Sequence, residues 1–200
     1  MEEKRYSYAS WLSFTAAALF ILGWGIGFTQ MLIGVRVFGY HGPVVGPSDL
    51  LFLGFSVIII YIAVMLRRYL NEFYNFHEID SIITASIIWT VCFQVISLLL
   101  KGFMLLGWSG DRVVFLVIIG SILVIANVSR GIIDIMKGVR LLKMPGCSDD
   151  LIKVYGYLSL VSGIAMASVI LAPIGLLLIP VNVIVLGMIF LKEGECVEFV

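Results

Sequence analysis

A polar stripe runs along one face of the helix that the sequence predicts over residues 81–101. Its members recur every three or four residues, which places them on one side of a helix: Ser86, Thr90, Gln94, Ser97 and Lys101. Polar side chains of a membrane-spanning helix face the bundle interior or a water-filled space. The stripe therefore lines a path for a solute or an ion, or it forms hydrogen bonds between helices, which is the commoner use of such groups in membranes.

Charged residues follow in the next predicted helix, over residues 112–142. Arg130 and Asp134 are four residues apart, a spacing that permits an ion pair on one helix face. A cation within the hydrocarbon region of a bilayer needs such a partner. We therefore predict that Asp134 anchors Arg130 near the membrane boundary.

The end of this helix has the composition of an amphipathic cytoplasmic extension. Three further cations follow Asp134 among apolar residues: Lys137, Arg140 and Lys143. We expect these three side chains to contact anionic lipid headgroups. The alternative is an ordinary solvated helix end with the cations that are usual on the cytoplasmic side.

Motifs of enzymes, metal sites and cofactor sites are absent from the sequence. No HExxH, GxSxG or phosphate-binding loop occurs. Cys92, Cys147 and Cys196 form no CxxC pair. His41 and His77 fall in predicted loops, and neither has a partner that would position it for catalysis. We expect no catalytic residue, cofactor or metal, and, with a formal net charge of +0, no nucleic acid partner.

Small residues are spaced for close contact between helices. Gly23 and Gly27 are four residues apart, and Ser159, Gly163 and Ala167 repeat at the same interval. Such spacing aligns small side chains on one face and lets two helix backbones approach closely in a membrane. The sequence therefore predicts helix contacts at both segments.

The elements that position these side chains are membrane-spanning helices. Hydrophobic residues make up 61% of the chain and charged residues 13%, against about 45–50% and about 25% in soluble domains. Residues 154–191 contain no charged side chain, and one helix of that length would cross the ~30 Å hydrocarbon core about twice. The run must fold back. We predict a turn at Ala172 to Gly175, because Pro173 disfavours helix in the preceding residue and glycine permits a reversal.

Charged residues divide the chain into six predicted spans. The predicted fold is all-α: a polytopic integral membrane protein, with a six-helix transmembrane bundle that forms a single domain over residues 1–200. The spans are residues 10–35, 50–68, 81–101, 112–142, 152–172 and 175–192. Six spans place both termini on one side, which then carries all of the 13 Lys and Arg residues except Arg36, Lys101 and Arg112. The positive-inside rule therefore predicts cytoplasmic termini, in the cell membrane.

The sequence leaves three functions open. Few buried charges and no recognisable site favour a non-catalytic membrane protein, a structural or accessory subunit or scaffold that associates with other membrane subunits or with itself. The alternative is a small oligomeric transporter or channel that uses the polar stripe. The third is a lipid-active membrane enzyme that uses His41 or His77 at the interface.

Overall fold

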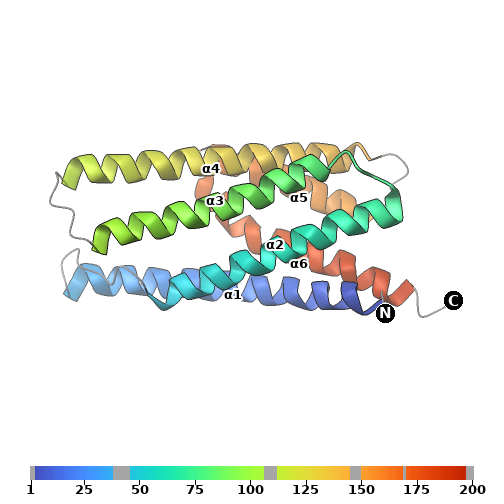
Figure 1. Ribbon diagram of the computed structural model, residues 1–200, viewed down its shortest axis with the longest axis horizontal. Coiled ribbons are helices and arrows are strands. Elements are labelled where there is room, and N and C mark those ends of the chain that lie inside the picture. The colour runs from blue at the N-terminus through green and yellow to red at the C-terminus, as the bar shows by residue number, and fades with distance from the viewer. Residues whose placement is uncertain (1–2, 38–45, 106–111, 145–149, 169, 197–200) are drawn as a thin grey trace.

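The computed structural model is a bundle of six α-helices (Figure 1). It describes residues 3–37, 46–105, 112–144, 150–168 and 170–196. The helices are α1 (Glu3–Val37), α2 (Pro47–Tyr74), α3 (Asp80–Leu105), α4 (Arg112–Leu142), α5 (Asp150–Ala167) and α6 (Ala172–Cys196). Long apolar runs adopt helix because the hydrocarbon region offers no water to the backbone, so each segment must satisfy its own amides and carbonyls.

Five of the helices have described stretches that are long and apolar enough to cross a membrane. These stretches are residues 6–29 of α1, 47–74 of α2, 80–100 of α3, 150–167 of α5 and 172–192 of α6. The remaining helix, α4, is 31 residues long and carries Arg130, Asp134 and Lys137 in its second half. The predicted class is confirmed: the chain is an all-α, polytopic membrane protein.

The six helices form a closed ring. Each helix packs against its neighbours in the chain, and α6 packs against α1 to complete the ring. Figure 1 shows the start of α1 and the end of α6 at the same end of the bundle, which we call the terminal end. The opposite end is the far end. The contacts of α3 with α2 and α4 are the sparsest in the ring.

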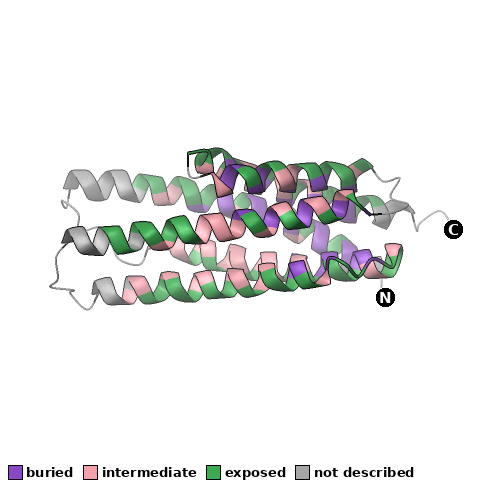
Figure 2. Ribbon diagram, turned by 90° about the horizontal axis from the view of Figure 1, so that it is seen from above, coloured by how far each residue is buried: buried purple, intermediate pink, exposed green. Residues whose placement is uncertain are grey.

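Buried side chains gather toward the terminal end (Figure 2). Tyr69 of α2 and Phe190 of α6 are fully buried there, with ring centroids 5.9 Å apart. Tyr6 of α1 packs edge-on against Tyr69 at 5.7 Å and donates a hydrogen bond to Glu72. This aromatic cluster joins α1, α2 and α6.

The connection between α2 and α3 is held by polar contacts. Asn75 ends α2 in a left-handed conformation (φ 48°, ψ 38°), which asparagine tolerates better than most residues. The backbone N–H of this cap donates a hydrogen bond to the Leu70 carbonyl. Asp80, the first residue of α3, accepts hydrogen bonds from the Asn71 amide at 3.2 Å and pairs with Arg67 at 3.1 Å. These contacts fix where α3 begins.

The turn between α5 and α6 lies one helical turn earlier than predicted. The predicted turn at Ala172 to Gly175 is wrong, because α5 ends at Ala167 and these residues form the start of α6. Pro173 is tolerated there, since amides in the first turn of a helix have no partner within it. Gly175 instead allows a close contact: a Cβ atom at this position would lie 2.6 Å from Cγ of Met166.

The α4 and α5 backbones meet at four glycines, Gly131, Gly138, Gly156 and Gly163, which we call the glycine seam. A Cβ atom at Gly138 would lie 2.7 Å from the Gly156 carbonyl oxygen, and one at Gly131 would lie 2.6 Å from that of Gly163. A side chain at Gly131, Gly138 or Gly163 would force the two backbones apart, and one at Gly156 would lie 3.1 Å from Cγ of Leu142. The predicted close contact at Gly163 is confirmed. A Cβ atom at Gly131 would also lie 2.6 Å from the backbone nitrogen of Ala167.

Candidate functional site

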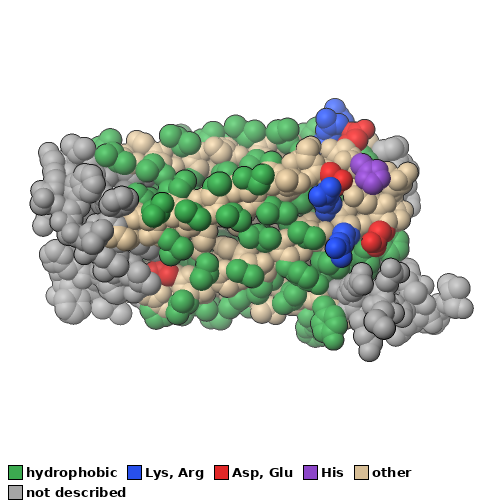
Figure 3. All heavy atoms as spheres, viewed as in Figure 1, with side chains coloured by type: hydrophobic (Ala, Val, Ile, Leu, Met, Phe, Trp, Pro, Cys, Tyr) green, Lys and Arg blue, Asp and Glu red, His purple; other side chains and the backbone are tan. Residues whose placement is uncertain are grey.

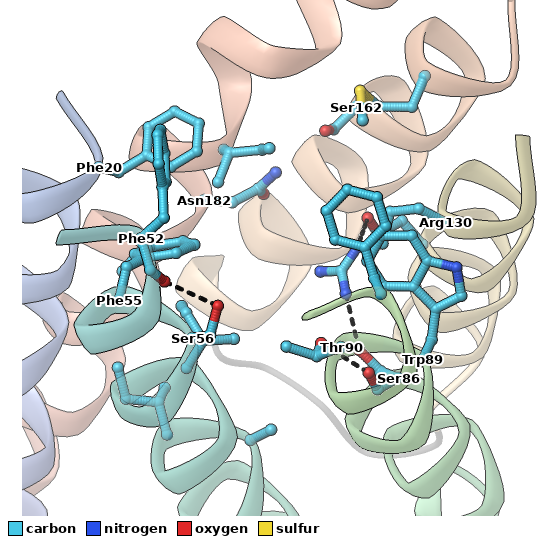
Figure 4. A pocket seen from close by; sticks show the side chains of 18 of the residues that line it. Phe20, Phe52, Phe55, Ser56, Ser86, Trp89, Thr90, Arg130, Ser162 and Asn182 are labelled. Atoms are coloured by element: carbon cyan, nitrogen blue, oxygen red, sulfur yellow. Dashed lines mark hydrogen bonds and ion pairs between the residues drawn. The ribbon is translucent and has the colours of Figure 1, made fainter. Parts of the chain in front are cut away.

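A cavity of about 370 Å³ lies inside the ring, and all six helices contribute to its lining. Its wall is largely aromatic and aliphatic on the side of α1, α2 and α6, where Phe20, Phe52, Phe55 and Ile179 lie. The opposite wall, from α3 and α4, carries most of the polar and charged groups. Figure 4 shows labelled side chains of the two walls facing each other across the cavity.

The polar stripe of α3 lies on this cavity. Ser86, Thr90, Gln94 and Ser97 all belong to the lining. Lys101, the fifth predicted member, lies in α3, and its side chain is outside the described part of the chain. The hydroxyl of Thr90 donates to the Ser86 carbonyl one turn earlier, at 2.8 Å, so this bond does not join two helices.

Three charged side chains of α4 line the same cavity, and we call them the charged cluster: Arg130, Asp134 and Lys137. Nε of Arg130 lies 2.9 Å from Oδ2 of Asp134, and Nζ of Lys137 lies 2.8 Å from Oδ1. The side chains of Asp134 and Lys137 are only 9% and 11% exposed, and that of Arg130 is 20% exposed. The carboxylate therefore holds both cations inside the bundle.

Neighbouring residues complete the surroundings of the two cations. Nη1 of Arg130 donates to the Ser86 hydroxyl at 3.0 Å, which joins α4 to α3 (Figure 4). The guanidinium lies 5.5 Å from the ring centre of Trp89, and Nζ of Lys137 lies 5.3 Å from that of Tyr155. Cations at such distances are attracted by the electron-rich ring faces. Trp89 and Tyr155 had not been predicted as site residues, since apolar helices contain many aromatics.

Asn182 of α6 adds an unusual group to the cavity wall. Its Oδ1 atom is buried without a hydrogen-bond partner among the described residues. Pro180 lies inside the same helix and has no amide hydrogen, so it offers no helical bond to the Leu176 carbonyl. Leu176 and Asn182 both line the cavity. The Asn182 side-chain oxygen therefore gives this wall one buried acceptor without a partner among the described residues.

The three cations predicted to contact lipid headgroups have different surroundings. Lys137 does not fit that prediction, because its ammonium is buried in the charged cluster. Arg140 is half-exposed and pairs with Glu78 near the terminal end. Lys143 is exposed just beyond α4. A contact with headgroups remains open for Arg140 and Lys143.

Among the described residues, the remaining candidates do not form a site. His77 is exposed and its ring lies 3.2 Å from the Asn75 side-chain oxygen, while His41 lies outside the described residues. Within the described ranges, no three His, Cys, Asp or Glu side chains are placed to hold a metal ion. Cys92 is exposed on α3.

The outer surface separates charged from apolar regions. On the face drawn in Figure 3, most coloured charged side chains gather toward the terminal end, acidic atoms are also visible toward the far end, and apolar side chains cover the middle of the bundle. This distribution suits a helix bundle surrounded by lipid, whose charged groups lie in the interfacial region. Among the described residues, the buried charged side chains are Asp134 and Lys137, both in the α4 cluster.

The chain was compared with known protein families, with curated proteins and with solved structures, and none of them matches it.

Proposed function

We propose that this chain is a small carrier that binds an amphiphilic molecule in the cavity between its six helices. The observation that supports the proposal is the meeting of the α3 stripe and the α4 charged cluster in one space of about 370 Å³. That volume falls in the usual range for small-molecule sites, which combine an apolar wall with a few polar groups. The described walls have this composition.

The hydrogen bonds of the stripe favour a ligand over helix adhesion. If the stripe served mainly to join helices, its hydroxyl groups would bond to neighbouring helices. Thr90 bonds within its own helix, and among the described hydroxyl groups of the stripe only that of Ser86 bonds to another helix, by accepting from Arg130 of α4. The stripe is then better suited to contact molecules inside the cavity.

The loose packing of α3 favours movement on that side of the ring. A carrier must open its site, and packed elements with few contacts move at the lowest cost. The helix pairs α4–α5 and α5–α6 include glycines whose added Cβ atoms would collide with the partner helix, and a Cβ atom added at Gly187 would make a tight contact between α6 and α1. No described glycine of α3 makes such a contact, since Gly102 has open space around it.

A second candidate function is the accessory subunit or scaffold. The outer face of α3 supports it, because Ile88, Val95 and Leu99 are 57%, 50% and 58% exposed. Another membrane subunit or a second copy would cover this face, although lipid would cover it equally well. The two functions differ in what remains bound after gentle purification: a small molecule or a protein.

For location, we propose the cell membrane with both termini in the cytoplasm. The proposal rests on the bias of Lys and Arg toward the terminal end of the chain's six-span arrangement. Single cysteines introduced at position 77 and position 44 provide the test. An impermeant thiol reagent added outside intact cells should modify position 44 and leave position 77 unmodified, and the reverse pattern would contradict the orientation.

Cavity filling provides the direct test of the carrier proposal. Thr90→Trp places an indole in the cavity, and Thr84→Trp places it on an exposed position of the same helix, outside the lining. Mass spectrometry of gently purified protein should detect the same bound small molecule in the wild type and Thr84→Trp, and lose it in Thr90→Trp. A small molecule retained by Thr90→Trp, or none in any of the three, would contradict the proposal.

A further inference from the structure

The charge balance of the cavity specifies the ligand further, on the assumption that the proposed carrier function holds. Two cations, Arg130 and Lys137, share one carboxylate, Asp134, so the charged cluster has one excess positive charge. An uncompensated charge inside a membrane protein is costly and is usually paired. We propose that the cavity takes an oxyanion carried on an alkyl chain, with the anionic group at Arg130.

Asp49, the other acidic residue in the lining, is too distant to balance this charge. Ser86, which bonds to Arg130, lies six residues from the start of α3 at the terminal end, or ~9 Å along the axis. Asp49 lies 25 residues before the end of α2, or ~37 Å from that end. Its carboxylate already accepts a hydrogen bond from the Gly46 amide at 2.9 Å. The excess charge therefore stays near Arg130.

The donors around Arg130 suit an oxyanion. A guanidinium has five N–H groups in a planar fork that matches carboxylate or phosphate oxygens. Its Nε donates to Asp134 and its Nη1 to Ser86, which leaves the Nη2 edge for a ligand. The Ser86 hydroxyl accepts from Arg130 and keeps its own hydrogen to donate. These donors lie together at the polar wall of the cavity.

The rest of the cavity suits an alkyl chain. Phe52, Phe55 and Ile59 of α2 face Leu176 and Ile179 of α6 around the lining. An alkyl chain would fill the space between these apolar side chains and contact them closely. A small inorganic anion would satisfy the charge and leave this apolar wall without a partner. The ligand class is therefore a chain with one anionic end.

Two probes of equal chain length distinguish the contribution of the anionic group to binding from that of the alkyl chain. Wild-type protein in nanodiscs of phosphatidylcholine is titrated with dodecanoate and with dodecanol by calorimetry. Because hydrogen bonds between charged groups contribute about 1.5–3 kcal/mol, dodecanoate should bind about tenfold or more tightly than dodecanol. Equal affinity for the two probes would overturn the assignment of an anionic ligand.

Variants test whether Arg130 provides this preference. Arg130→Gln leaves the neutral Asp134–Lys137 pair and should remove the preference for dodecanoate. Arg140→Gln removes an exposed cation that lies outside the cavity lining and should retain it. If Arg130→Gln does not fold, Ser86→Ala should weaken dodecanoate binding severalfold without changing dodecanol binding. An unchanged preference in the folded variant would overturn the assignment.

The same titration distinguishes failure of this inference from failure of the carrier proposal. Loss of the bound molecule in Thr90→Trp together with equal affinity for both probes would support the carrier proposal and reject the anionic ligand.

Repeating the titration in phosphatidylglycerol nanodiscs identifies the source of the ligand. Weakened dodecanoate binding there would show that an anionic bilayer lipid occupies the site, and unchanged binding would indicate a free amphiphile. Acetate, which has the charge and no chain, should not compete, and full competition would reject the alkyl chain.

Discussion

The two sides of α4 differ in how closely they pack. Toward α5, the glycine seam brings the backbones so close that Cβ atoms added at Gly131, Gly138 and Gly163 would lie 2.6–2.8 Å from backbone atoms of the partner. Toward α3, large side chains such as Trp89 and Phe93 separate the helices, and the cavity lies behind them. The comparison shows how one helix joins a close-packed part of the bundle to an open one.

Side-chain size explains the difference. Glycine at two-turn spacing removes the side chain at the points where α4 and α5 approach most closely, so dispersion contacts that include backbone atoms stabilise this pair. On the cavity side, polar groups of α3 need solvation that a tightly packed apolar contact could not provide. We infer that the glycine seam is a rigid support and that the α3 side is the part that admits a ligand.

Removal of the buried carboxylate should have the largest effect on stability. Asp134→Asn leaves Arg130 and Lys137 inside the bundle without their shared anion, which should lower the free energy of unfolding by about 3–5 kcal/mol. Asp80→Asn is the control, because Arg67, its partner, is half-exposed and such pairs contribute about 0–1 kcal/mol. Unfolding in mixed detergent micelles measures both. Equal losses in the two variants would show that the charged cluster is effectively solvated.

Widening of the glycine seam should have the next largest effect. Gly138→Ala would place a Cβ atom 2.7 Å from the Gly156 carbonyl oxygen, and the overpacking should cost about 1–3 kcal/mol of unfolding free energy. Gly120→Ala is the matched control in the same helix, since no atom lies within 4 Å of its Cβ position. It should instead stabilise α4 by about 0.5–1 kcal/mol. Similar values for both variants would remove the distinction between the two sides of α4.

Change of the polar stripe should have the smallest effect on stability. Thr90→Val removes a hydroxyl that bonds only to its own helix, so the unfolding free energy should change by about 0.5 kcal/mol or less. The same detergent unfolding experiment measures it. A loss well above 1 kcal/mol, beyond the ~0.6 kcal/mol average for interhelical bonds, would show that the stripe holds helices together.

Much of the fold could be predicted from the sequence, because helices in lipid leave simple signals. Charged residues bounded the spans, and the fourth predicted span, 112–142, coincides with α4. The turn after α5 was misplaced, because Pro173 and Gly175 suit both a reversal and the start of a helix. Only packing decides between these, and Met166 lies where a side chain at position 175 would be.

The site could be predicted only in part. The spacing of Ser86 and Thr90 placed them on one face, but nothing in the sequence showed that α4 would lie against that face. Lys137 was expected in the headgroup region although its spacing of three residues from Asp134 also permits an ion pair, because the sequence does not show which of the two contacts forms. Asn182 comes from α6, nearly a hundred residues away, so its place on the same cavity depends on closure of the ring.

Protection of α3 by a ligand tests the central claim most directly. Cys92 is exposed on α3, and Gln94, two residues later, lines the cavity. Two single-cysteine proteins are compared: one keeps Cys92, and the other carries Gln94→Cys with Cys92 replaced by serine, both with serine at positions 147 and 196. The rate of modification by N-ethylmaleimide is measured with and without dodecanoate. We expect dodecanoate to slow modification at position 94 severalfold and to leave the rate at position 92 unchanged. Equal rates with and without dodecanoate at position 94 would contradict it.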